Sequence, residues 1–128
     1  MRKIKPPASW VKKKANRGFR GYPVATVAFY GPTADLATKL AVSIIEDDGK
    51  EPSLLERWYS DGKDIRRDAV VGLQVEAFLR RHPVRTVAAA DRIIGCPHEE
   101  GLDYPDGESC PQCPFWAGRD RFTHERIH

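Results

Sequence analysis

The pattern of hydrophobic positions predicts a strand as the first regular element of the folded body. The stretch YPVATVAFYG, residues 22–31, is rich in Val, Ala, Phe and Tyr and ends at a Gly-Pro pair. This composition is typical of a central strand that is followed by a turn. A short turn or helix is expected next, over TADLAT at residues 33–38.

The following apolar stretch is compatible with two structures. Leu36, Leu40 and Ile44 have the spacing of one helix face, and such a helix would be followed by a strand. Alternatively, LAVSII and LLERWYS pair as a hairpin across the DDGKEP loop. The β-branched residues of the first segment and the Asp-Gly pair of the loop favour the hairpin.

The clearest periodicity follows Asp68 and predicts a helix over residues 69–82. Asp68 suits the N-cap, the basic residues at the other end suit the negative end of the helix dipole, and Pro83 stops the helix. VRTVAAADRII, residues 84–94, is expected to form a further strand, parallel to its predecessor across the helix. The residues expected on the buried face of the helix are Val71, Val75, Phe78 and Leu79.

Length and composition agree with one globular domain. A chain of 128 residues can bury a hydrophobic core, and contents of 41% hydrophobic and 30% charged residues are ordinary for a soluble protein. No apolar run reaches the roughly 18 to 20 residues of a membrane span. The basic N-terminus lacks the apolar stretch of a secretion signal, so we expect a cytoplasmic protein that contacts no membrane.

The charge is distributed unevenly along the chain. Although the net charge is +3, residues 1–21 contain eight of the 21 basic residues and no acidic residue. This leaves 13 basic against 18 acidic residues in the rest, a formal charge of −5. We therefore expect a basic N-terminal arm over residues 1–21 and a single α/β domain over residues 22–128, with a metal-binding loop at 95–116.

Basic and aromatic side chains are interleaved in this arm. A segment that neutralises phosphates and stacks on bases needs this combination, and Ser9 is placed to cap a short helix that ends before Gly18. Alternatively, the arm is disordered or folds back onto the acidic body, with its aromatic residues as anchors. The residues expected to contact RNA, DNA or a ribonucleoprotein surface are Lys3, Lys5, Trp10, Lys12, Lys13, Lys14, Arg17 and Arg20.

Cysteine and histidine residues near the C-terminus predict a zinc site. Three cysteines are an odd number, which disulfides cannot use completely, and a C-x-x-C pair suits a metal or a redox site. Zn²⁺ prefers four tetrahedral thiolate and imidazole ligands, and one tight turn can supply two of them. The first candidate set consists of Cys96, His98, Cys110 and Cys113.

Other ligand sets remain open from the sequence alone. Cys110, Cys113, His124 and His128 have a spacing close to that of a zinc finger, although the interval before the histidines is shorter than usual. A mixed set is compatible as well. The C-x-x-C pair is also compatible with a redox-active dithiol that holds no metal.

The same stretch imitates a zinc deaminase, in which H-x-E precedes P-C-x-x-C. Here His98 and Cys110 are too close in sequence for the helix and strand of such a site, and Ser109 replaces the proline. A closed structural site without catalytic residues is therefore expected. The alternative is a small zinc-dependent hydrolase or deaminase-like enzyme with Glu99 or Glu100 as general base.

The run DRIIGCPHEEGLDYPDGESCPQCPFW, together with VAFYGP and the helix before it, resembles a group of small uncharacterised bacterial proteins. The resemblance extends from Tyr22 to Arg121 and implies a compact domain, without an activity to transfer. The complete prediction is an α/β (α+β) fold: a small mixed sheet with a hairpin or meander, one main helix, and a C-terminal zinc-bound loop. The expected function is a zinc-stabilised binding or adaptor module.

Overall fold

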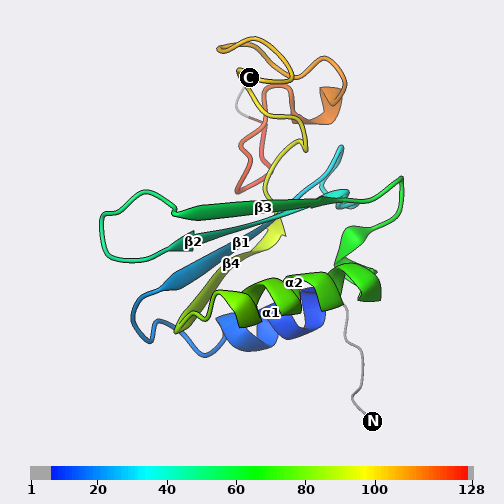
Figure 1. Cartoon of the computed structure of the whole chain (residues 1–128). Coiled ribbons are helices and arrows are strands. Elements are labelled where there is room, and N and C mark those ends of the chain that lie inside the picture. Colours follow the sequence, from blue (N-terminus) through cyan, green and yellow to red (C-terminus); the bar gives the residue numbers. More distant parts are fainter. Residues whose placement is uncertain (1–6, 127–128) are drawn as a thin grey trace.

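The computed structural model of this protein describes residues 7–126 (Figure 1). Two longer helices and four strands form its body, and a loop-rich segment follows the last strand. The elements are α1 (Pro7–Ala15), β1 (Val24–Tyr30), β2 (Lys39–Ile45), β3 (Leu54–Tyr59), the 3-10 helix η1 (Ile65–Arg67), α2 (Ala69–Arg81), β4 (Thr86–Ile93) and the 3-10 helix η2 (Pro114–Trp116).

The four strands form one mixed sheet in the order β3-β2-β1-β4. β2 pairs antiparallel with both β1 and β3, whereas β4 pairs parallel with β1. β3 and β4 therefore run in the same direction at opposite edges of the sheet, and α2 connects them. This arrangement confirms the α+β fold, the helix crossover and the hairpin, and the alternative of a helix through Leu40 and Ile44 is wrong.

Burial alternates along the two central strands, so one face of the sheet carries the core. α1 and α2 both lie against this face (Figure 1). On α2, Val75 and Phe78 point into the core, and Phe78 contacts the ring of Trp58 edge to face. The buried strand residues on this face are Ala25, Val27 and Phe29 of β1 and Leu40, Val42 and Ile44 of β2.

The limits of α2 agree closely with the predicted range of 69–82. The carboxylate of Asp68 accepts hydrogen bonds from the N–H groups of Val70 and Val71, at 3.0 and 3.1 Å, which makes it the N-cap. The helix ends at Arg81, just before Pro83. None of the helices in the described part of the chain has the length and apolar character that crossing a bilayer requires.

Helix α1 packs onto the body of the protein. Trp10 and Val11 are 9% and 3% exposed and belong to the core, where α1 contacts β4, η1 and α2. The expected cap at Ser9 is wrong, because Ser9 lies inside a helix that already includes Pro7. The arm residues Lys3 and Lys5 lie outside the described residues.

The turn after β1 brings two stretches of backbone very close together. Residues 33–38 form this irregular turn and no helix. A Cβ atom added to Gly31 would lie only 1.6 Å from the carbonyl oxygen of Leu36, so no larger residue fits without movement of the backbone.

We predict that Gly31→Ala lowers the free energy of unfolding by more than about 3 kcal/mol, because the clash is with backbone that cannot rotate away. Gly18→Ala is the matched control. The Cβ of Ala at this position would meet nothing within 4 Å. The expected cost is therefore only that of the left-handed backbone conformation, with a φ of 74°, which is about 1–2 kcal/mol. Urea denaturation of both variants measures the difference, and equal losses would contradict the prediction.

Candidate functional site

Four potential metal ligands meet in the loop that follows β4. The ligand atoms of Cys96, His98, Cys110 and Cys113 all lie within 4.8 Å of one another. The Nδ1 atom of His98 is 3.2, 3.4 and 3.5 Å from the sulfur atoms of Cys96, Cys110 and Cys113. Tetrahedral Zn²⁺ with ordinary bond lengths places nitrogen and sulfur ligands about 3.6 Å apart. The cluster therefore has the ligand types and spacing to bind a metal such as zinc.

Two tight turns supply these ligands. In the first turn, the N–H group of His98 donates to the sulfur of Cys96 at 3.2 Å. In the second, the N–H group of Cys113 donates to the carbonyl oxygen of Cys110 at 3.4 Å. Gly95 has a φ of 121°, which turns the chain away from the end of β4 directly before the first ligand.

The three thiols are buried, and none of them forms a disulfide. Burial is the main cause that raises the pKa values of the Cys96 and Cys113 thiols, because desolvation disfavours the thiolate. A bound cation reverses the preference, since a thiol that coordinates a metal loses its proton.

His124 lies outside the cluster. Its Nε2 atom is 2.6 Å from the carbonyl oxygen of Ile93, and its ring contacts that of Trp116 at 5.2 Å between centroids. The zinc-finger set would require this hydrogen bond to break. The other histidine of that set, His128, is outside the described residues.

Trp116 connects the metal cluster to the core of the domain. Its indole N–H donates to the carbonyl oxygen of Gly31 at 2.8 Å, and its side chain packs against both the cysteines and the core. A second bond joins the same two segments, from the N–H group of Gly31 to the carbonyl oxygen of Gly95 at 2.9 Å. The cluster is thus fixed to the ends of β1 and β4.

Glu99, beside the cluster, is engaged by two cations. The distances from its carboxylate are 3.0 Å to the Nζ of Lys39 and 2.8 Å to the Nε of Arg57. The hydrogen bond from Arg57 is the main cause that lowers the pKa of Glu99, and Lys39 adds to the effect. The neighbouring Glu100 accepts a hydrogen bond from the N–H group of Gly107 at 2.7 Å. Neither carboxylate is arranged as a general base, because both are held by partners within the protein.

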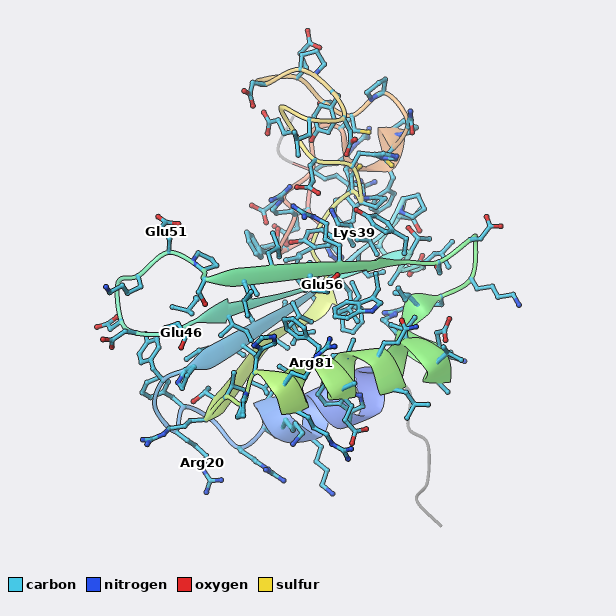
Figure 2. All side chains as sticks on the ribbon, in the orientation of Figure 1. Arg20, Lys39, Glu46, Glu51, Glu56 and Arg81 are labelled. Atoms are coloured by element: carbon cyan, nitrogen blue, oxygen red, sulfur yellow. The ribbon has the colours of Figure 1, made fainter. Side chains whose placement is uncertain are left out.

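Lys39 is the residue of this site that sequence reasoning missed. Its side chain is only 5% exposed, and its Nζ lies over the rings of Tyr30 and Tyr59, at 5.2 and 5.8 Å from their centroids. It also donates to the carbonyl oxygen of Pro97 at 3.1 Å. Figure 2 shows Lys39 at the base of the metal-binding loop. The sequence offers one weak signal, a lysine at the start of an apolar strand.

The residues expected to bind nucleic acid fall into two groups. Trp10 is buried in the core, so its ring is not available to stack on a base. The described basic residues of the set are all exposed, on α1 and on the loop that follows it. Helix α1 lies on the helix-covered side of the sheet, away from the metal-binding loop (Figure 1). These residues are Lys12, Lys13, Lys14, Arg17 and Arg20.

Comparisons with protein-family models, with curated proteins and with solved structures find no match to this chain.

We predict that His98→Ala abolishes stoichiometric metal binding, whereas His124→Ala leaves it unchanged, because His98 faces the three sulfurs and His124 contacts Ile93 instead. Metal content of the purified variants provides the measurement. X-ray absorption of the wild type should then detect three sulfur ligands and one nitrogen ligand per metal ion. A shell of two sulfurs and two imidazoles would contradict this ligand set.

A second prediction concerns Glu99. Glu99→Ala should lower the free energy of unfolding by about 1–3 kcal/mol, because the buried ammonium group of Lys39 loses its carboxylate partner. Metal content should not change, since Glu99 is not a ligand. Glu108→Ala is the control, because Glu108 is exposed on the same loop. Thermal and chemical denaturation compare the two variants, and an unchanged stability of Glu99→Ala would refute its structural role.

Proposed function

We propose that this chain is a small nucleic-acid-binding module whose C-terminal segment is held together by a closed structural zinc site. The observation that carries the proposal is the exposed basic surface of α1 and the loop that follows it. Trp10 and Val11 anchor this helix in the core. Their burial fixes the orientation of α1, so the neighbouring lysines extend into solvent from an ordered helix.

The structural role of the metal follows from its ligands. Three thiolates and one imidazole complete the tetrahedral shell of Zn²⁺ and leave no position for a reactive water. The segment from Gly95 to Arg126 contains one short 3-10 helix and no strand longer than an isolated bridge. Such a segment buries little apolar surface by itself, and the free energy of metal binding therefore contributes directly to its folding.

The distribution of charge supports contact with a polyanion. Residues 12–20 contain five basic residues and no acidic residue. Acidic residues gather instead on the β2–β3 loop, where Figure 2 shows Glu46 and Glu51. An ordered helix also loses less conformational entropy on binding than a disordered arm would. Lysine and arginine side chains on such a surface can neutralise the phosphate groups of a nucleic acid.

The alternative function, a small zinc-dependent hydrolase or deaminase-like enzyme, needs a free carboxylate and an open metal position. Glu99 is bound by Lys39 and Arg57, and Glu100 is bound by a backbone N–H group. Four protein ligands also surround the proposed ion position. These contacts favour the binding module over the enzyme.

The test is the salt dependence of binding to a fluorescent single-stranded oligonucleotide. Each neutralised phosphate releases condensed counterions, so the logarithm of the affinity should fall with the logarithm of the salt concentration by about 0.7 per contact. Lys12/Lys13→Gln should reduce this slope by about 1.4. Lys50/Lys63→Gln removes two exposed lysines from other loops and should change it little. The absence of binding at low salt, or equal effects of both pairs, would reject the proposal.

A further inference from the structure

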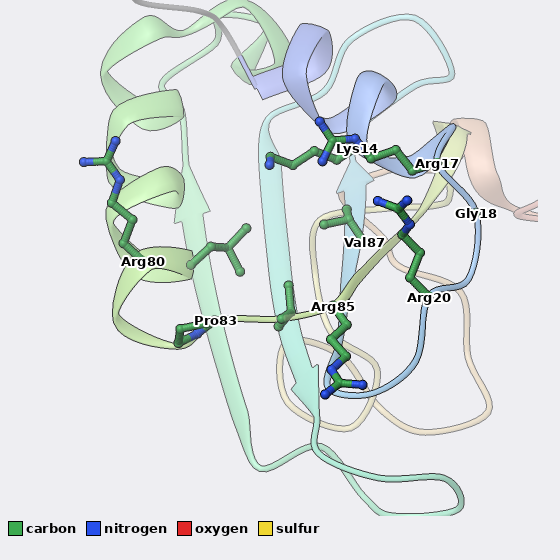
Figure 3. A pocket seen from close by; sticks show the side chains of 10 residues that line it. Lys14, Arg17, Gly18, Arg20, Arg80, Pro83, Arg85 and Val87 are labelled. Atoms are coloured by element: carbon green, nitrogen blue, oxygen red, sulfur yellow. The ribbon is translucent and has the colours of Figure 1, made fainter.

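A pocket opens where the C-terminal ends of α1 and α2 meet the start of β4 (Figure 3). Its volume is about 340 Å³. This lies at the lower end of the range of about 300–1,000 Å³ that is usual for small-molecule sites. A ligand of roughly nucleotide size therefore fits it.

The rim of this pocket is strongly basic. No acidic residue lines it, and Arg80 forms an ion pair with Glu76 at 3.0 Å. In the part of the chain that the structure describes, the other four basic side chains have neither a hydrogen bond nor an ion pair. The five basic residues of the rim are Lys14, Arg17, Arg20, Arg80 and Arg85.

Helix dipoles do not account for this concentration of charge. Each helix C-terminus is equivalent to about half a negative charge, so the two helix ends near the pocket offset only about one of the four cations that lack partners. The remaining positive groups repel one another across a small space. A bound anion removes this repulsion, which gives the pocket a preference for negatively charged ligands.

The floor of the pocket is apolar and suits a different part of the same ligand. Leu79, Val84 and Val87 contribute to it, together with Pro83. Phe19 lies in the chain between two residues of the rim and is 69% exposed. In a bound single strand, a phosphate would lie on the basic rim, its base on the apolar floor, and a neighbouring base against the ring of Phe19.

We propose that this pocket binds one nucleotide unit of a single-stranded nucleic acid, with its phosphate on the arginines and its base over the apolar floor. The inference rests on the proposed function and identifies the site that selects single strands. A paired base inside a duplex is stacked between its neighbours and cannot enter the pocket.

The experiment compares two double variants that each remove two positive charges. Arg20/Arg85→Gln changes the pocket, and Lys12/Lys13→Gln changes the surface of α1 outside it. We expect the pocket variant to lose at least about tenfold more affinity for a single-stranded oligonucleotide, because charge-assisted hydrogen bonds are lost. Metal content and melting temperature check that both variants are folded.

A second readout monitors the floor of the pocket. Methyl resonances of Leu79 and Val87 should shift when the single strand is added, and a duplex of equal length should leave them unchanged. Inorganic phosphate should compete for the rim without shifting these methyl groups as the oligonucleotide does. A phosphoserine peptide that binds more tightly than the oligonucleotide would overturn the proposal.

The outcomes separate this inference from the function on which it rests. If Lys12/Lys13→Gln weakens binding and Arg20/Arg85→Gln does not, the pocket assignment is wrong while the proposed function stands. Equal affinity for duplex and single strand, without methyl shifts, would also overturn the assignment. If the wild type binds no oligonucleotide at low salt, the proposed function and the pocket assignment fail together.

Discussion

The strands bury one face of their sheet under two helices, and this burial determines where the remaining segments lie. The face covered by α1 and α2 carries large apolar residues from β1 and β2. The opposite face carries Thr26 and Ser43, whose hydroxyl groups are hydrogen-bonded to each other, and also the partly exposed Leu55 and Tyr59. Both α1 and α2 lie against the first face (Figure 1). The metal-binding loop is instead attached at one end of the sheet.

That end of the sheet is unusually rich in specific contacts. Trp116 packs against the core, and its indole N–H donates to the carbonyl oxygen of Gly31. Lys39, the first residue of β2, forms an ion pair with Glu99 of the loop. These contacts come from residues far apart in the sequence, and each one limits how the loop can move relative to the strands. The cysteine and histidine cluster lies within the loop, whereas Trp116 and Lys39 attach the loop to the strands. Metal binding and sheet packing are therefore expected to stabilise one another.

Acidic and basic residues gather on different segments of the molecule. The acidic β2–β3 loop lies at a hairpin tip, where Asp48 accepts a hydrogen bond from the hydroxyl of Tyr22 at 3.3 Å, while the basic residues of α1, of α2 and of the loops next to them converge on the helical side. Packing of Trp10 and Val11 turns a basic segment of the sequence into a defined surface, and α2 adds Arg80 to it. The proposed partner, a single-stranded nucleic acid, has phosphate groups that suit the basic rim of this surface and unpaired bases that suit its apolar floor.

Local rules in the sequence were sufficient for most of the secondary structure and for the four residues that form the cluster. The limits of α2 could be predicted from Asp68 and Pro83, because an N-cap and a proline act on the helix within a few residues. The alternating pattern of β2 was harder to assign, because Leu40 and Ile44, four residues apart, share a face in a strand as well as in a helix. Val42, also buried, decides for the strand. The pairs Cys96/His98 and Cys110/Cys113 were detectable for the same reason, since each pair closes within one turn.

Only the tertiary structure determined the features that depend on distant residues. Several contacts join segments that no local sequence pattern relates. They are the packing of Trp10 in the core, the contact between the ring of His124 and the carbonyl oxygen of Ile93, and the ion pairs of Glu99. The sequence revealed a basic segment and a set of cysteine and histidine residues with the spacing of metal ligands. It did not establish that α1 docks on the core, or that arginines from separate segments of the chain share one pocket. Those features arise from packing across the sheet. The hydrophobic effect is non-directional, so which apolar residues contact one another is determined only by the fold of the whole chain.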